Sequence, residues 1–146
     1  MTRRRTARRI IVGPLVVGTA LIGASALAAA PAHATPGGVT VALNGTVLTV
    51  TGDAVANAVL MGQTAAGDIT LNATPVLGGG ATTTNVSNIV VDGGPGNDTL
   101  ALDETNGPMP PIEFRDSEGN DQLFGGSGGD TLRGGPGGDT TVGGRG

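Results

Sequence analysis

The sequence predicts an all-β fold built from many short strands. Runs rich in Val, Thr, Ala and Leu follow residue 38, and β-branched residues are favoured in strands. An Asn44-Gly45 pair between two such runs is a strong hairpin signal, because both residues tolerate positive φ in a type I′ turn. From residue 92 onwards, Gly and Asp recur with a nine-residue period, which indicates stacked repeats. Outside the N-terminal segment 1–34, the sequence has no helical pattern.

The N-terminal segment 1–34 has the pattern of an export signal. The apolar run at 10–30 follows five arginines: Arg3, Arg4, Arg5, Arg8 and Arg9. Ala32-His33-Ala34 matches an A-x-A cleavage site, so we expect a signal peptide at residues 1–34 and a secreted, extracellular protein that begins at Thr35. The alternative is an uncleaved anchor helix, because an apolar run of this length can span a bilayer. The paired arginines leave general and twin-arginine export both open.

Cleavage would leave a strongly acidic chain. The signal holds five of the eight arginines and the only histidine, so 12 acidic residues remain against three arginines, a net charge of −9. Such a surface repels nucleic acid and anionic membranes and favours cations. Without His, Cys or Lys, the common nucleophile-and-base arrangements cannot be assembled, and we expect no enzyme activity. Asp103 and Glu104 are adjacent carboxylates, and we interpret them as a solvated loop pair.

Strand candidates precede the repeats in regular order. They lie at residues 39–43, 46–50, 58–61, 68–71 and 88–91, separated by breaks at 62–67, Pro75 and 78–80. We therefore expect a β-rich region over residues 35–91. It either caps the repeats or forms an independent, sandwich-like module.

Four nine-residue units follow this region. They are GGPGNDTLA at 93–101, DSEGNDQLF at 116–124, GGSGGDTLR at 125–133 and GGPGGDTTV at 134–142, with GGRG after them. Gly at the first, second and fourth positions lets a tight turn adopt positive φ and bring its carbonyls close to a common point. Carboxylate and carbonyl oxygens are then the available ligands, and they suit Ca²⁺ better than Mg²⁺ or Zn²⁺.

These units resemble the GGxGxDxUx nonapeptide of the RTX, or haemolysin-type, calcium-binding repeat family. The 93–101 and 125–133 units match every defined position, whereas the others depart at Asp116, Ser117 and Thr141. The resemblance covers residues 92–146. It implies a parallel β-roll, which is a β-helix or solenoid whose six-residue turns alternate between two edges, with Ca²⁺ between turns that are two repeats apart.

The resemblance also implies the metal ligands. The carboxylates would be Asp98, Asp116, Asp121, Asp130 and Asp139. The turn carbonyls would come from Gly93, Gly96, Gly119, Gly125, Gly128, Gly134 and Gly137. Asp121 and Asp139 would share one ion, and Asp98 would stack on the same edge if residues 103–111 hold a five-residue insertion before a strand at 112–114. Asp130 would then face an irregular turn and form a weaker site.

The aliphatic content of the repeats is low. Only Leu100, Leu123 and Leu132 occupy the inward-facing position, and we expect Phe114 and Phe124 to add to the core at one end. Because so little apolar surface offsets the conformational entropy of ordering, we expect the repeats to fold on binding Ca²⁺. Residues 51–60 resemble a decayed repeat with Asn57 in place of the Asp, as is common in a terminal capping unit.

The sequence thus favours a secreted calcium-binding protein whose Gly/Asp repeats coordinate Ca²⁺ between stacked turns. The alternative is a cell-envelope or adhesive module in which calcium is purely structural. The expected partners are calcium ions, with no nucleic acid and no membrane after signal cleavage. A cell-envelope partner, or self-association through the open end of the roll, is a further expectation.

Overall fold

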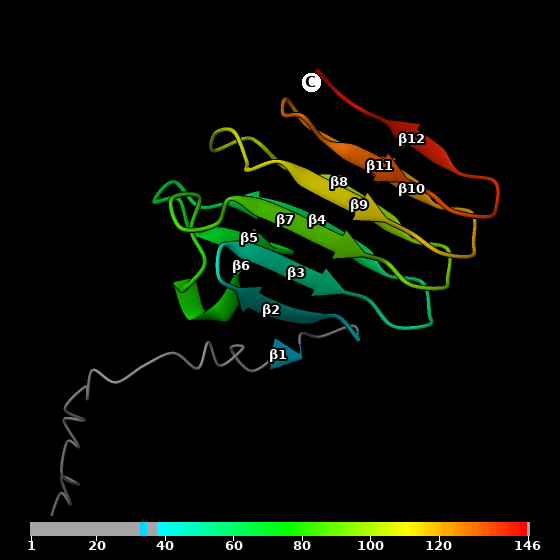
Figure 1. Cartoon of the computed structure of the whole chain (residues 1–146), viewed down its shortest axis with the longest axis horizontal. Helices are drawn as coiled ribbons and strands as arrows, with labels where there is room; N and C mark the ends of the chain where they lie inside the picture. The colour runs from blue at the N-terminus through cyan, green and yellow to red at the C-terminus, as the bar shows by residue number, and fades with distance from the viewer. Residues whose placement is uncertain (1–32, 35–37, 146) are drawn as a thin grey trace, which may run out of the picture.

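The computed structural model describes residues 33–34 and 38–145, and this part of the chain is strand-rich. Its strands form two six-stranded sheets (Figure 1). The expected all-β class is confirmed. The described residues contain no helix that is long and apolar enough to cross a membrane. Apart from His33 and Ala34, the expected signal peptide, and with it the alternative of an anchor helix, lies outside the described residues.

Each sheet combines strands from the repeats with strands that precede them. The first sheet contains, in spatial order, β1 (His33–Ala34), β2 (Thr40–Asn44), β3 (Val47–Thr51), β7 (Asn88–Asp92), β9 (Ile112–Arg115) and β11 (Thr131–Arg133). The second contains β12 (Thr140–Val142), β10 (Gln122–Phe124), β8 (Thr99–Leu102), β4 (Ala58–Gln63), β5 (Ile69–Leu71) and β6 (Thr74–Pro75). The 3-10 helix η1 (Val76–Gly79) follows β6.

From β7 to β12 the chain alternates between the two sheets, one strand at a time (Figure 1). β3, β7, β9 and β11 pair in parallel, and so do β4, β8, β10 and β12. In contrast, β2 pairs antiparallel with β3, and β5 with β4, so both sheets are mixed. The parallel pairing expected of the repeats is thus found among the alternating strands and extends to β3 and β4, whereas short hairpins add antiparallel strands at the N-terminal end.

Two rows of turns connect the sheets. The turns that lead from the first sheet to the second are residues 52–57, 93–98, 116–121 and 134–139, and we call this row the first edge; it lies on the right in Figure 1. Residues 103–111 and 125–130 return the chain to the first sheet, and we call their row the second edge.

The strand registers match the spacing that the sequence predicts. Gln122 of β10 pairs with Thr140 of β12, which is two nine-residue repeats further along the chain. On its other side Gln122 pairs with Thr99 of β8, and this offset exceeds two repeats by five positions. The longer offset confirms a five-residue insertion between β8 and β9. Strands are also found where the five earlier runs predict them, as β2, β3, β4, β5 and β7.

Two local expectations are wrong. Asn44 pairs with Val47, so the loop of the first hairpin consists of Gly45 and Thr46 and not of Asn44 and Gly45. Gly45 has φ +62, and Thr46 is not among the residues with positive φ, which is the pattern of a type II′ turn and not of type I′. The helix η1 is also unexpected; its path is broken at Leu77 and Gly78, where φ is positive.

Aliphatic side chains fill the space between the sheets. Leu100, Leu123 and Phe114 are fully buried, and Leu132 packs against this core while partly exposed. The strands before the repeats contribute most of the other fully buried side chains: Val41, Leu48, Val50, Val59, Met61, Ile69, Ile89 and Val91. The repeats thus share one apolar core with the strands that precede them.

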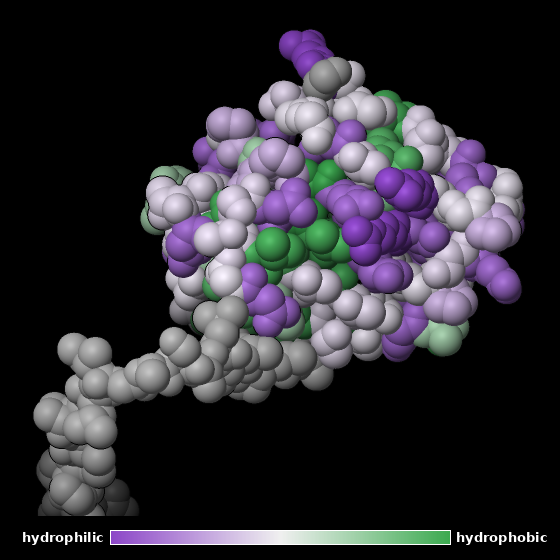
Figure 2. Space-filling model, viewed as in Figure 1, coloured by the Kyte–Doolittle hydropathy of each residue, from purple (hydrophilic) through white to green (hydrophobic). Residues whose placement is uncertain are grey.

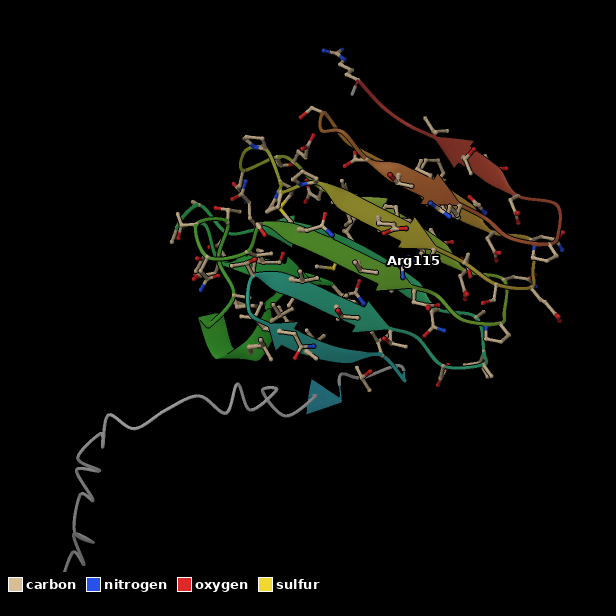
Figure 3. The ribbon with its side chains drawn as sticks, in the orientation of Figure 1. Arg115 is labelled. Atoms are coloured by element: carbon tan, nitrogen blue, oxygen red, sulfur yellow. The ribbon has the colours of Figure 1, made fainter. Side chains whose placement is uncertain are left out.

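Charged side chains on the outer face of the first sheet contribute little to stability. Figure 2 shows polar residues beside an apolar patch on this face. Glu113 accepts from Arg115 at 2.7 Å and lies 3.7 Å from Arg133, and Figure 3 shows Arg115 on β9. Both arginine side chains are more than half exposed, so solvent and salt screen these ion pairs.

The close stacking of turns gives a first prediction. A Cβ at Gly119 would collide with the carbonyl oxygen of Gly96 in the preceding turn, whereas a Cβ at Gly129 would meet no heavy atom within 4 Å. We expect Gly119→Ala to lower the free energy of unfolding by about 1–3 kcal/mol, and Gly129→Ala to change it by at most about 0.5 kcal/mol. Urea denaturation of both variants in one buffer measures this, and equal effects would contradict the stacking.

Candidate metal centre

The sixth-position aspartates of the first edge are joined by a ladder of hydrogen bonds. Asp121 Oδ1 accepts the backbone N–H of Asp98 at 2.9 Å, and Asp139 Oδ1 accepts the N–H of Asp121 at 3.0 Å. Asp98 Oδ1 in turn accepts the N–H of Asn57 at 2.6 Å. Each carboxylate therefore holds the preceding turn, and the expected stacking of Asp98, Asp121 and Asp139 on one edge is confirmed.

A second ladder runs in the opposite direction at the fifth position. Asn97 Oδ1 accepts the N–H of Asn120 at 2.8 Å, and Asn120 Oδ1 accepts the N–H of Gly138 at 2.9 Å. Our sequence analysis did not single out these asparagines. The sequence does contain a signal for them, because Asn-Asp occupies the fifth and sixth positions of both the 93–101 unit and the 116–124 unit. Together the two ladders fix the register of adjacent turns.

The remaining carboxylate oxygens converge on one point. One ligand oxygen each from Asp98, Asp116 and Asp121 lies within 4.8 Å of the others. The Oδ2 atoms of all three residues are buried and have no hydrogen-bond partner. Asp98 and Asp121 are each only 1% exposed, and Asp116 follows directly after β9. Burying these oxygens without a partner is costly, so the cluster requires a positive group or protons.

The electrostatics of Asp116 reflect this crowding. Burial raises the pKa of the Asp116 carboxyl to about 7, and the charges of Asp98 and Asp121 raise it further, against a hydrogen bond from the N–H of Ser117. A cation that prefers hard oxygen ligands would relieve the desolvation and the repulsion together. Because Ca²⁺ binds hard oxygen ligands in loose geometry, the three carboxylates fit this ion.

Gly93 provides the space for the cluster. A Cβ on this residue would lie 2.8 Å from Asp98 Oδ2 and 2.8 Å from both carboxylate oxygens of Asp116. The expectation that first-position glycines adopt positive φ is wrong, because neither Gly93 nor Gly134 does so. Positive φ is found at the second position in Gly94 (+85°) and Gly135 (+80°), but not in Gly126, and at the fourth position in Gly96 (+159°) and Gly137 (+157°). First-position glycines are instead needed for close approach to a carboxylate.

The other predicted carboxylates lie in different surroundings. Asp130, on the second edge, uses both oxygens: Oδ1 accepts the N–H of Ile112 at 3.2 Å and Oδ2 that of Gly126 at 2.8 Å. Asp139 is partly exposed and lies outside the three-carboxylate cluster. The structure therefore groups Asp121 with Asp98 and Asp116, and an ion shared by Asp121 and Asp139 stays a prediction.

The predicted carbonyl donors are distributed over both edges. Gly93, Gly96, Gly119, Gly134 and Gly137 lie in the turns of the first edge, and Gly125 and Gly128 lie in turn 125–130 of the second. Backbone hydrogen bonds join these turns, from Gly96 N–H to Glu118 O at 2.9 Å and from Gly119 N–H to Pro136 O at 3.2 Å. The glycines are thus placed in the stacked turns, and their role as ligands stays a prediction.

Glu104 has a structural role that the sequence interpretation missed. Its Oε2 accepts the N–H of Ser127 at 2.8 Å, while Oε1 accepts the Ser127 hydroxyl at 3.1 Å and the N–H of Met109 at 3.2 Å. Burial raises the pKa of Glu104, but these hydrogen bonds outweigh burial and hold the pKa below its ordinary value. Glu104 therefore fastens the inserted loop to turn 125–130, and only Asp103 fits the expected exposed loop carboxylate.

Substituting Asp121 and Asp130 tests which carboxylates bind metal. We expect Asp121→Asn to weaken Ca²⁺ binding by at least about tenfold, a free-energy change of about 1.4 kcal/mol, because it removes a charged ligand with a free oxygen. Asp130→Asn should weaken it much less, since both oxygens of Asp130 already accept N–H groups. Isothermal titration calorimetry measures both affinities. Equal losses in the two variants would contradict the assignment.

The raised pKa of Asp116 predicts the pH dependence of the metal-free protein. The carboxyl ionises near 3.8 when unfolded and near 7 in the fold, so its protonated form contributes stability below about pH 4 that is lost as pH rises through about 7. We expect thermal melting in chelator to show a falling melting temperature over this range. Asp116→Asn should remove this fall, and an unchanged pH profile in that variant would refute the interpretation.

Comparison with known proteins agrees with this site. A scan against protein-family models matches the RTX calcium-binding nonapeptide repeat in four copies, over residues 90–106 and 116–146, about a third of the chain. No curated protein and no solved structure matches. The matched segments include Asp98, Asp116 and Asp121. Residues 90–106 and 116–146 of this chain are therefore similar to RTX calcium-binding nonapeptide repeats.

Proposed function

We propose that this protein is a secreted calcium-binding protein that coordinates Ca²⁺ between the stacked turns of a parallel β-roll and orders its repeats on binding. One observation carries the proposal: the Oδ2 atoms of Asp98, Asp116 and Asp121 are buried together without hydrogen-bond partners. Three like charges in one buried cluster oppose folding, and a divalent cation would reverse the sign of that contribution. The proposal assigns no catalysis to the site.

The strand order supports the β-roll. From β7 to β12 each strand joins the opposite sheet from its predecessor, and strands of the same sheet pair in parallel. Parallel stacking brings equivalent positions of successive turns into one row, so ligands from neighbouring turns can reach the same ion. We propose that residues 35–91 cap this roll at its N-terminal end, where β2 and β5 close the parallel rows with antiparallel pairing.

Folding on binding is supported by the small apolar contribution of the last repeats. Leu132 is only partly buried, and the three residues of β12 are all exposed. Ordering these units gains little free energy from apolar burial. The rest of the free energy that offsets the lost conformational entropy must come from cross-links between turns. We propose that bound Ca²⁺ supplies these cross-links, as is common for small metal-dependent folds.

Secretion is supported by the sequence of residues 1–34 and by the charge of the remainder. A net charge of −9 after cleavage disfavours contact with anionic membranes and nucleic acid, and extracellular fluids supply Ca²⁺ for weak sites. In the alternative, a cell-envelope or adhesive module, the same site would serve stability alone. Sedimentation of the protein with cell-envelope material, with Ca²⁺ and with chelator, separates the two: only the alternative requires the protein to pellet.

A calcium titration tests the proposal. We expect circular dichroism to show a gain of β signal when Ca²⁺ is added to metal-free protein, and a much smaller gain with Mg²⁺, which requires a stricter octahedral geometry. Asp98→Asn should reduce the response to Ca²⁺. A spectrum that stays the same across millimolar Ca²⁺, with no heat of binding, would refute the proposed function.

A further inference from the structure

The first turn of the first edge is closed without a sixth-position carboxylate. Asn57 is 4% exposed, and its Nδ2 atom donates to the carbonyl oxygens of Val55 at 2.5 Å, Asp53 at 3.4 Å and Gly93 at 3.4 Å. It also lies 3.4 Å from Asp53 Oδ1. Because oxygens surround this atom, the nitrogen and not the oxygen of the amide belongs here.

The Nδ2 atom of Asn57 corresponds in position to the Oδ2 atoms of the later aspartates. A Cβ built on the first residue of each turn serves as a common reference point. At Gly52 this Cβ would lie 2.9 Å from Asn57 Nδ2, and at Gly93 it would lie 2.8 Å from Asp98 Oδ2. At Gly134 it would contact Asp139 Oδ2. Where the later turns place a carboxylate oxygen, the first turn places a hydrogen-bond donor.

The other end of the Asn57 amide agrees with this correspondence. Oδ1 of Asp98, Asp121 and Asp139 each accepts the N–H of the sixth residue in the preceding turn. Asn57 belongs to the first such turn in the described chain, and its Oδ1 is buried without a hydrogen-bond partner. Among the described residues no turn precedes turn 52–57 on this edge, so no sixth-position N–H is present to donate to Asn57 Oδ1.

We propose that the side-chain amide of Asn57 takes the place of a bound cation, so that turn 52–57 stacks on turn 93–98 without Ca²⁺. The inference rests on the proposed function, in which the later turns bind Ca²⁺. The two amide hydrogens satisfy carbonyl oxygens that would otherwise face a carboxylate and need a metal. Turn 52–57 then forms without metal and acts as a template, meaning a preformed surface on which the aspartate-containing turns stack when Ca²⁺ binds.

The substitution Asn57→Asp tests the template directly. It replaces the donor by a carboxylate oxygen beside the carbonyls of Asp53, Val55 and Gly93, and so completes an oxygen-only site next to Asp98. We expect calorimetry and native mass spectrometry to show an additional Ca²⁺ ion per chain, and a lower melting temperature in chelator. Asn72→Asp is the matched control, because Asn72 also bonds backbone through both amide atoms, but it is exposed and its partners are Ala58 and Leu60 of β4 and not the carbonyls of the turns. Its stoichiometry should equal that of the wild type.

Hydrogen exchange of the unmodified protein provides a test that needs no variant. The amide N–H groups of Asn57 and Thr99 join the first two turns, and those of Asp121 and Thr140 join the last two. In chelator we expect the first pair to stay protected while the second pair exchanges rapidly, and Ca²⁺ to protect both. Equal exchange of the pairs in chelator, or an unchanged ion count in Asn57→Asp, overturns the inference. A wild-type protein that binds no Ca²⁺ overturns the proposed function instead, and the exchange pattern still decides whether the first turn closes alone.

Discussion

The stack depends on how each sixth-position aspartate of the first edge uses its two carboxylate oxygens. In Asp121, one oxygen accepts the N–H of Asp98 and so fixes the distance between two turns, while the other is buried without a donor. The contact that aligns the turns therefore also forces unpartnered oxygens into one small volume. Alignment and repulsion have the same origin. A cation relieves the repulsion and preserves the alignment, whereas protonation of Asp116 relieves it only below about neutral pH.

The two edges differ because of the insertion at 103–111. On the first edge, consecutive turns of equal length place their sixth positions in line, and Asp116 adds a third carboxylate where the repeat pattern has Gly. On the second edge, turn 125–130 adjoins the irregular loop, and Glu104 of that loop accepts hydrogen bonds from Ser127. Asp130 is likewise satisfied by backbone N–H groups. On the second edge, N–H and O–H groups of the protein satisfy the carboxylates. On the first edge, a bound metal ion would have to do so.

Periodic features of the structure could be predicted from sequence, and contacts between non-equivalent positions could not. The spacing of Asp98, Asp121 and Asp139 was enough to predict one row of turns and the length of the insertion, because parallel stacking repeats positions. The bond between Glu104 and Ser127 depends on the path of an irregular loop, which no period describes. The hairpin turn lies at Gly45 and Thr46, one residue later than predicted, and in this register Val41 pairs with Val50 and Leu43 with Leu48. The run at 68–71 predicts the strand β5, but nothing in the sequence pattern predicts its antiparallel pairing with β4 or the strand β6.

Apolar burial decreases toward the C-terminal end of the stack. At its N-terminal end, fully buried side chains such as Leu48 pack between the sheets, and Asn57 closes the first turn by hydrogen bonds alone. In the middle, Leu100 and Leu123 are still fully buried, but three carboxylates now share one cluster. At the C-terminal end, Thr141 occupies the inward position and Val142 is 48% exposed, so little apolar surface leaves water there. The last two units gain less from burial than the two units before them, while the backbone entropy of ordering a nine-residue unit stays nearly constant. Order should therefore extend from the N-terminal end, and the last turns should be the first to separate when Ca²⁺ is removed.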